Sequence, residues 1–110
     1  MNKDGLHIAI LSNTIYSGQM FMREQDEEFT KKGQNLFFDK YGNQYRLFSG
    51  ADSIRGYRFD QVIIVDFQLD RKLFDYALMS IYGDIIPKEY RVQYVNFPKS
   101  IAIGELYGKY

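Results

Sequence analysis

Two short runs of uninterrupted apolar residues, at positions 8–11 and 62–65, constrain the fold of this chain more than any other feature. A strand buried on both faces has this pattern, because helices cover both sides of a parallel sheet. Apolar residues at helical spacing follow each run, from Ile15 to about Lys32 and from Arg71 to about Tyr82. A further strand is predicted at Arg91–Val95. The sequence therefore predicts an α/β fold with a small mixed sheet, a parallel centre and flanking helices.

A β-hairpin is expected between the two strand–helix units. The strand-like runs Asn35–Asp39 and Gln44–Phe48 flank Lys40–Asn43, a turn whose Gly and Asn tolerate positive φ. Earlier in the chain, Ser12-Asn13-Thr14 is suited to cap the first helix. Near its end, the sequence permits a short strand at Ser100–Ile103.

Composition limits the class of protein. With 110 residues, 45% of them apolar, residues 1–110 are expected to form a single domain with a real core. The chain has no cysteine, and His7 is its only histidine, which excludes thiol metal sites, histidine clusters and Ser-His-Asp triads. Fourteen basic and fourteen acidic residues give a formal charge of zero, which disfavours strong non-specific binding to nucleic acid or anionic membrane. The first apolar run is too short for a signal or membrane segment, so we expect a cytoplasmic location.

Asp66 follows the second apolar run directly, at the position where parallel strands present ligand-binding residues. Many buried strands end in an aspartate that is solvated or caps a helix, and that interpretation stays open. The residues leading to Asp66 follow a defined order: Gly42-Asn43 in the hairpin turn, Gly50-Ala51-Asp52, Arg55-Gly56, Asp60, and then Val62–Asp66.

This order resembles the stretch leading into the Walker B strand of phage terminase large subunits, the ATPases that drive DNA into capsids. The motif covers residues 50–66, and the order of elements covers roughly residues 7–97. Superfamily 1 helicases carry a comparable motif. The resemblance implies a truncated P-loop-NTPase-like fold of phage or prophage origin, in which Asp66 is a candidate metal or nucleotide ligand. It also implies that Asn96, after the next strand, is a candidate γ-phosphate sensor.

The chain departs from this pattern where hydrolysis would need it most. It contains no Gly-x-x-x-x-Gly-Lys-Ser/Thr loop to hold phosphates, and Gly104–Lys109 is one residue too short to be one. Phe67 occupies the position of the glutamate that activates water in those ATPases. An aromatic ring cannot polarise water, so we expect no hydrolysis by this chain alone, no catalytic residue and no cofactor.

Several other groups of residues are candidates for binding. Nucleic acid is a possible ligand of Arg46, Arg55, Arg58 and Tyr57, which form a small basic and aromatic set. The alternative is that Arg55 pairs with Asp52 or Asp60 and shapes the loop. The acidic run Glu24–Glu28 is either a divalent-ion site or a solvated helix face. Tyr107 and Tyr110 are candidate interface residues, and an open strand edge favours a homodimer or a hetero-complex.

Three hypotheses follow. In the first, the chain is a non-catalytic relative of the terminase ATPase that acts by binding a protein, as a motor component or as an inhibitor of a host factor. In the second, it is a split subunit of a packaging ATPase, and another chain supplies the phosphate loop. In the third, it is a small nucleic-acid-binding protein, which the zero net charge disfavours.

Overall fold

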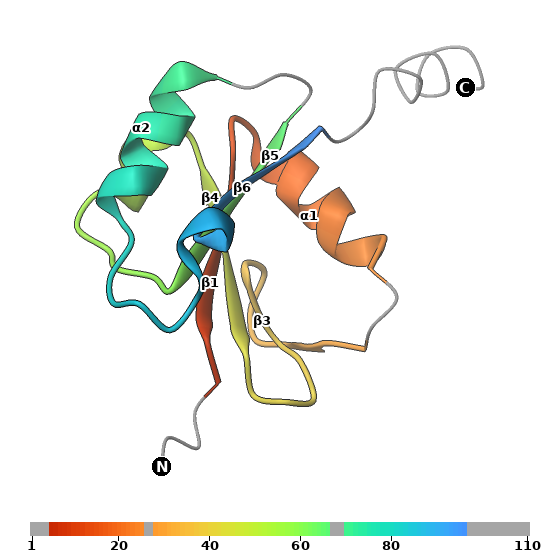
Figure 1. Cartoon of the computed structure of the whole chain (residues 1–110). Helices are drawn as coiled ribbons and strands as arrows, with labels where there is room; N and C mark the ends of the chain where they lie inside the picture. Colours follow the sequence, from red (N-terminus) through yellow and green to blue (C-terminus); the bar gives the residue numbers. More distant parts are fainter. Residues whose placement is uncertain (1–4, 26–27, 67–69, 97–110) are drawn as a thin grey trace.

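The computed structural model describes residues 5–25, 28–66 and 70–96, and a six-stranded sheet forms its centre (Figure 1). The strand order is β2-β3-β4-β1-β5-β6. In chain order, the elements are β1 (His7–Ser12), α1 (Ile15–Arg23), β2 (Thr30–Lys31), β3 (Leu36–Phe38), β4 (Gln44–Ser49), the 3₁₀ turn η1 (Ala51–Ile54), β5 (Gln61–Asp66), α2 (Arg71–Met79), the 3₁₀ turn η2 (Lys88–Tyr90) and β6 (Val92–Asn96).

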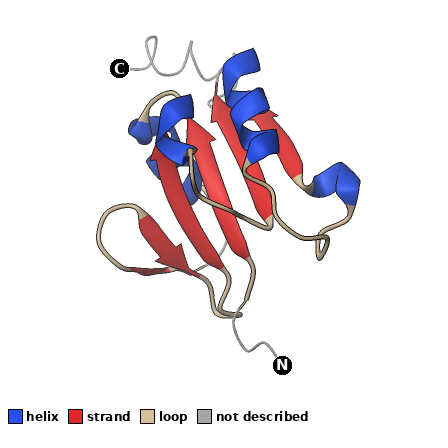
Figure 2. Ribbon diagram, turned by 90° about the vertical axis from the view of Figure 1, so that its left-hand side faces the viewer, coloured by secondary structure: helices blue, strands red, loops and turns tan. Residues whose placement is uncertain are grey.

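The sheet is mixed, as the sequence predicts. Strands β4, β1, β5 and β6 run parallel to one another, whereas β3 is antiparallel to both β4 and β2. The expected hairpin is confirmed, because Phe37 of β3 pairs with Tyr45 of β4 across the turn. The six strands lie side by side in Figure 2, with the two-residue β2 at one edge and β6 at the other.

Helices cover both faces of the parallel centre, with α1 on one side and α2 on the other (Figure 1). Alternation along each strand divides the core into two clusters. Ile10 and Val65 pack with Met22 of α1 on one face, and Leu11 and Ile64 pack with Leu73 of α2 on the other. Uninterrupted apolar runs were needed because both faces of these strands exclude water. The expectation of flanking helices is therefore confirmed.

The prediction that the first helix continues to about Lys32 is wrong, since α1 ends at Arg23. Gln25 closes the helix by donating its side-chain Nε2 to the Phe21 carbonyl at 2.8 Å. Phe29 packs instead into the sheet core, 5.4 Å from the Tyr45 ring, and Thr30–Lys31 adds a short antiparallel strand. Carboxylates near a helix C-terminus oppose the helix dipole, so the acidic run that begins at Glu24 favours an early end. Beyond the end of the helix, Thr30–Lys31 pairs with β3.

The second helix is also shorter than predicted, ending at Met79 rather than near Tyr82. Ser80 donates its Oγ to the Tyr76 carbonyl, which satisfies one of the free carbonyls of the last turn. The chain then extends and forms a β-bridge between Ile81 and Phe59. The bridge is held by two hydrogen bonds, from Phe59 N to Ser80 O at 2.7 Å and from Tyr82 N to Phe59 O at 2.8 Å. Pairing with Phe59, which is distant in the sequence, therefore ends the helix although the apolar pattern continues at helical spacing.

Some predictions fall outside the described residues: the strand at Ser100–Ile103, the role of Phe67, and the interface residues Tyr107 and Tyr110. Within residues 5–25, 28–66 and 70–96, the structure contains no helix with the length and apolar character needed to cross a membrane.

Candidate functional site

The carboxyl ends of the four parallel strands meet at one end of the sheet, and the connections from β1 and β5 leave it in opposite directions. From β1 the chain passes through α1 to reach β4 on one side; from β5 it passes through α2 to reach β6 on the other. The two strands are neighbours. In open α/β sheets, ligands bind beyond the carboxyl ends of such a strand pair. The residues after β1 and β5 therefore form the first candidate site.

Asp66 ends β5 and is buried, with 8% of its surface exposed. Its carboxylate Oδ2 accepts a hydrogen bond from the backbone N–H of Asn13, the residue after β1, at 3.0 Å. Its backbone carbonyl accepts from the Tyr94 hydroxyl at 3.2 Å. The side chain thus links the ends of β1 and β5, as expected of a carboxylate placed at a strand end.

Asn96 lies directly beside Asp66, because the two residues are partners in the parallel β5–β6 register. They therefore point to the same face of the sheet. Asn96 is exposed, whereas Asp66 is buried. The structure brings together the two residues that the resemblance singles out, 30 positions apart in the chain. Whether they bind a metal or nucleotide stays a prediction.

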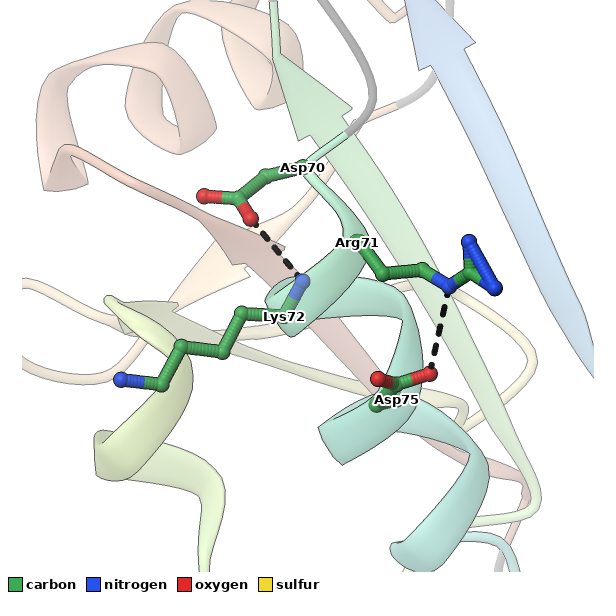
Figure 3. A network of polar contacts seen from close by, with 4 residues as sticks. All are labelled: Asp70, Arg71, Lys72 and Asp75. Atoms are coloured by element: carbon green, nitrogen blue, oxygen red, sulfur yellow. Dashed lines mark hydrogen bonds and ion pairs between the residues drawn. The ribbon is translucent and has the colours of Figure 1, made fainter.

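Sequence reasoning missed two members of this group, Asn13 and Asp70. Asn13 donates a hydrogen bond from its side-chain Nδ2 to Asp70 Oδ2 at 3.2 Å, and its backbone N–H donates to Asp66. Asp70 caps α2 by accepting the Lys72 N–H at 2.9 Å (Figure 3). One turn on, Arg71 and Asp75 form an exposed ion pair at 3.8 Å (Figure 3). The sequence signal for this group was a polar residue after each of two strands, β1 and β5, which are neighbours in the sheet.

Hydrogen bonds keep the Asp70 carboxylate ionised. Donation from the Lys72 backbone, and then from the Asn13 side chain, lowers the pKa of Asp70 below its ordinary value. Together, Asp66 and Asp70 offer two carboxylates next to the amide of Asn13. Oxygen donors of this kind suit a hard cation such as Mg²⁺, which proteins often hold with one or two carboxylates plus substrate phosphates. No group of three or more acidic or histidine side chains gathers in the described part of the chain.

The basic and aromatic set is assembled only in part. The Arg46 guanidinium lies 5.9 Å from the centre of the Tyr57 ring, and that ring packs 5.0 Å from Phe48. Arg58 donates to the Tyr57 carbonyl at 3.1 Å. Arg55 forms no ion pair with Asp52 or Asp60 in the described structure, where Asp60 instead accepts the His7 N–H at 2.8 Å. The loop is therefore not shaped by the ion pair that the alternative interpretation proposed.

The acidic run gives little support to a metal site. Glu24 and Glu28 are both exposed, and both lie beyond the end of α1 at Arg23. Residues 26–27 lie outside the described part of the chain. The described members therefore do not share a helix face, as the longer predicted helix would have required.

An apolar surface between α2 and β6 is a third candidate site, and the sequence did not predict it at this position. Nine large apolar or aromatic side chains are exposed in the described structure. Six of them fall within residues 78–94, and we call this set the α2–β6 surface: Leu78, Met79, Tyr82, Ile85, Tyr90 and Tyr94. The sequence signal was the concentration of tyrosines in the last third of the chain.

A hollow of about 440 Å³ lies between α2 and β6, and of the six exposed side chains Leu78 lines it. Its walls are the apolar side chains Phe74, Leu78, Ile81 and Val92, and its charged members are Lys88 and Arg91. Arg91 is held in place by donating Nε to the Ile86 carbonyl at 2.7 Å. None of the described residues that line the hollow is acidic. It is thus an apolar site with a basic rim.

No protein-family model matches the chain, and no curated protein matches it. The terminase resemblance therefore stays a hypothesis based on residues 50–66, and a function has to be argued from the geometry of these three groups.

Proposed function

We propose that this chain acts by binding another protein and does not itself hydrolyse a nucleotide. The observation that carries the proposal is the α2–β6 surface, with its six exposed large apolar side chains, together with the hollow beside α2 that one of them, Leu78, lines. Tyr82 and Ile85 are 70% and 66% exposed. Concentrated apolar exposure of this kind is typical of surfaces that a partner covers, whereas single exposed apolar residues need no explanation.

The chemistry of the hollow indicates what the partner presents. Phe74, Leu78 and Val92 accept apolar side chains, and burial of that area drives association. Lys88 and Arg91 add positive charge at the rim, with no acidic neighbour in the described lining to offset it. The partner is therefore a protein segment with apolar side chains next to an aspartate or glutamate. Such pairing of charge sets specificity and the rate of association more than affinity.

The sequence supports the absence of hydrolysis. The chain has no phosphate-binding loop, and the turn after β1 is Asn13-Thr14, whose Thr14 caps α1. The resemblance to terminase ATPases suggests where to look for the partner: among the subunits of a packaging motor, or among host ATPases that such a relative would inhibit.

A peptide library displayed on phage tests the proposal without a known partner. The purified chain should enrich peptides that combine apolar residues with an acidic one. Tyr82→Ser should weaken their binding, whereas Tyr41→Ser should not, because Tyr41 is similarly exposed (66%) but lies in the β3–β4 turn. Failure to enrich any peptide, or equal binding by both variants, would contradict the proposal. So would ATP turnover by the purified chain that Asp66→Ala removes.

The second candidate function is that of a subunit that contributes Asp66 and Asn96 to a nucleotide site completed by another chain. The register that places these residues side by side, with Asp70 linked to Asp66 through Asn13, favours it. In a reconstituted complex with ATPase activity, Asp66→Ala should abolish turnover, and the exposed Asp75→Ala should not. Unchanged turnover in the Asp66 variant would end this hypothesis.

A further inference from the structure

The two edges of the sheet differ in how they are protected. The β2 edge has two residues, Thr30 and Lys31, and a lysine on so short a strand discourages further pairing. The β6 edge has five residues, Val92–Asn96, with no charged residue and no proline. No strand of the described structure pairs with the outer side of β6. Among the described residues, the longer and less protected edge is therefore the one open to another strand.

The backbone groups that point outward from β6 follow from its pairing with β5. The Arg91 carbonyl accepts the Val62 N–H at 2.8 Å, so Arg91 faces β5. Backbone groups alternate in direction along a strand, which turns those of Gln93 and Val95 toward β5 as well. The N–H and C=O groups of Val92, Tyr94 and Asn96 consequently point outward. They are centred on Tyr94.

This arrangement matches itself under a two-fold rotation. In an antiparallel pair of two β6 strands, Tyr94 lies opposite Tyr94 of the second copy, and Val92 lies opposite Asn96. Each outward N–H then meets an outward C=O. No like charges oppose each other, since the strand carries none. Tyr94 is 37% exposed, so its ring is available for a cross-strand aromatic contact, which stabilises antiparallel pairs.

We propose that β6 pairs with β6 of a second copy of this chain, joining two sheets into one across a two-fold axis at Tyr94. This goes beyond the proposed function: it concerns the backbone edge of the sheet, whereas the partner protein covers the hollow beside α2, although Val92 and Tyr94 belong to both regions. A C₂ interface of this type is self-complementary, as the symmetry of the outward groups requires.

Charge reversal at the axis tests the register. The mass of the full chain in solution should rise from monomer to dimer with concentration. Tyr94→Lys and Tyr94→Glu should each be monomeric, because each places like charges directly opposite, and an equal mixture of the two should dimerise again. Gln93→Lys is the matched control, since position 93 lies opposite position 95 and not itself. A wild-type chain that stays monomeric at every concentration, or a dimer that survives both Tyr94 variants, would overturn the proposal.

A cysteine cross-link keeps the test decisive if a charged residue at position 94 prevents folding. The natural chain has no cysteine, so a single introduced thiol has no competitor. Directly opposed residues of a hydrogen-bonded antiparallel pair have Cα atoms about 5.5 Å apart, within the roughly 4.4–6.8 Å range of disulfides. Oxidised Tyr94→Cys should therefore form a covalent dimer. Gln93→Cys should not, because its two copies would lie about 8 Å apart. Equal cross-linking at both positions, or at neither, would refute the β6 pairing.

Discussion

Asn43 donates two hydrogen bonds to Asp39, from its backbone N–H to Oδ1 and from its side-chain Nδ2 to Oδ2, both at 2.9 Å. The same carboxylate accepts the Tyr41 N–H at 2.9 Å and the Tyr45 hydroxyl at 3.1 Å. Asn43 in turn accepts the Leu6 N–H at 2.8 Å through Oδ1. A single buried aspartate thus organises the β3–β4 turn and, through Asn43, connects it to the start of β1.

Replacing Asp39 should destabilise the fold. In Asp39→Ala, donors from three residues lose their acceptor in a place where Asp39 is only 8% exposed. Hydrogen bonds to a charged group are worth more than neutral ones, so we expect a loss of roughly 2–3 kcal/mol in the free energy of unfolding. Urea denaturation measures it. The exposed Asp84→Ala is the control, and an equal effect in both variants would contradict the role of Asp39.

Asp39 should also make stability depend on pH. Burial raises the pKa of its carboxyl, but the hydrogen bonds from Asn43, Tyr41 and Tyr45 outweigh burial, so that pKa lies below its ordinary value of 3.8. A carboxyl of this kind stabilises the folded state above the unfolded-state pKa. The contribution is lost as pH falls through the folded-state pKa. Urea denaturation at several pH values below neutrality should show a steeper loss of stability in acid for the natural chain than for Asp39→Ala. Parallel curves would disprove the prediction.

Asn13 should control the ionisation of Asp70. The Lys72 N–H and the Asn13 side chain both lower the pKa of Asp70. Asn13→Ala removes only the second donor, so the pKa of Asp70 should rise yet stay below its ordinary value. NMR titration of the Asp70 carboxyl carbon measures the change. Asn96→Ala, which removes the amide beside Asp66 and no hydrogen bond to Asp70, should leave the titration unaltered.

The sequence predicted the parallel centre of the fold well, because local pattern determines it. The apolar runs at residues 8–11 and 62–65 are buried except for the half-buried Ile63, and β5 ends at Asp66 where the apolar run stops. Thr14 caps α1, accepting the Ser17 N–H at 3.3 Å, as the residue types there indicate. These features depend on neighbours close in sequence.

Features that depend on distant partners were missed. The end of α1 is determined by Phe29, which packs against Phe37 and Tyr45, residues that a helical pattern cannot anticipate. The end of α2 is determined in the same way by Phe59, which forms a β-bridge with Ile81. In both cases tertiary pairing overrides a weak helical periodicity.

The candidate site was half predicted. Asp66 was identified by its position at the end of a strand and Asn96 through the terminase resemblance, and the parallel register places them side by side. Asn13 was expected to cap a helix with its neighbours. Its contacts with Asp66 and Asp70 join segments 53 and 57 residues apart, and nothing local to Asn13 reports that proximity.

The nucleic-acid hypothesis makes its own prediction at Arg46 and Arg58. Binding to a phosphate backbone releases counterions, so any complex with single-stranded DNA should weaken steeply as salt rises. Replacing both arginines by glutamine should remove it, whereas Arg71→Gln, which disrupts only the exposed ion pair with Asp75, should not. A salt-dependent gel shift that survives the double replacement would rule out Arg46 and Arg58 as the residues that hold the nucleic acid.

Gly18 permits α1 to lie close to the sheet. A Cβ atom at this position would stand 3.2 Å from Leu47 Cγ and 3.6 Å from Ile10 Cγ2, and both neighbours are buried. Gly18→Val should therefore overpack the core and lower the free energy of unfolding by roughly 1–3 kcal/mol. The cause is contact with Leu47, so the same replacement should cost less in a Leu47→Ala background, where the space is vacant. Urea denaturation of the four chains in this double-mutant cycle measures the coupling. Equal losses in the two backgrounds would show that the cost of valine arises within the helix and not from its contact with β4.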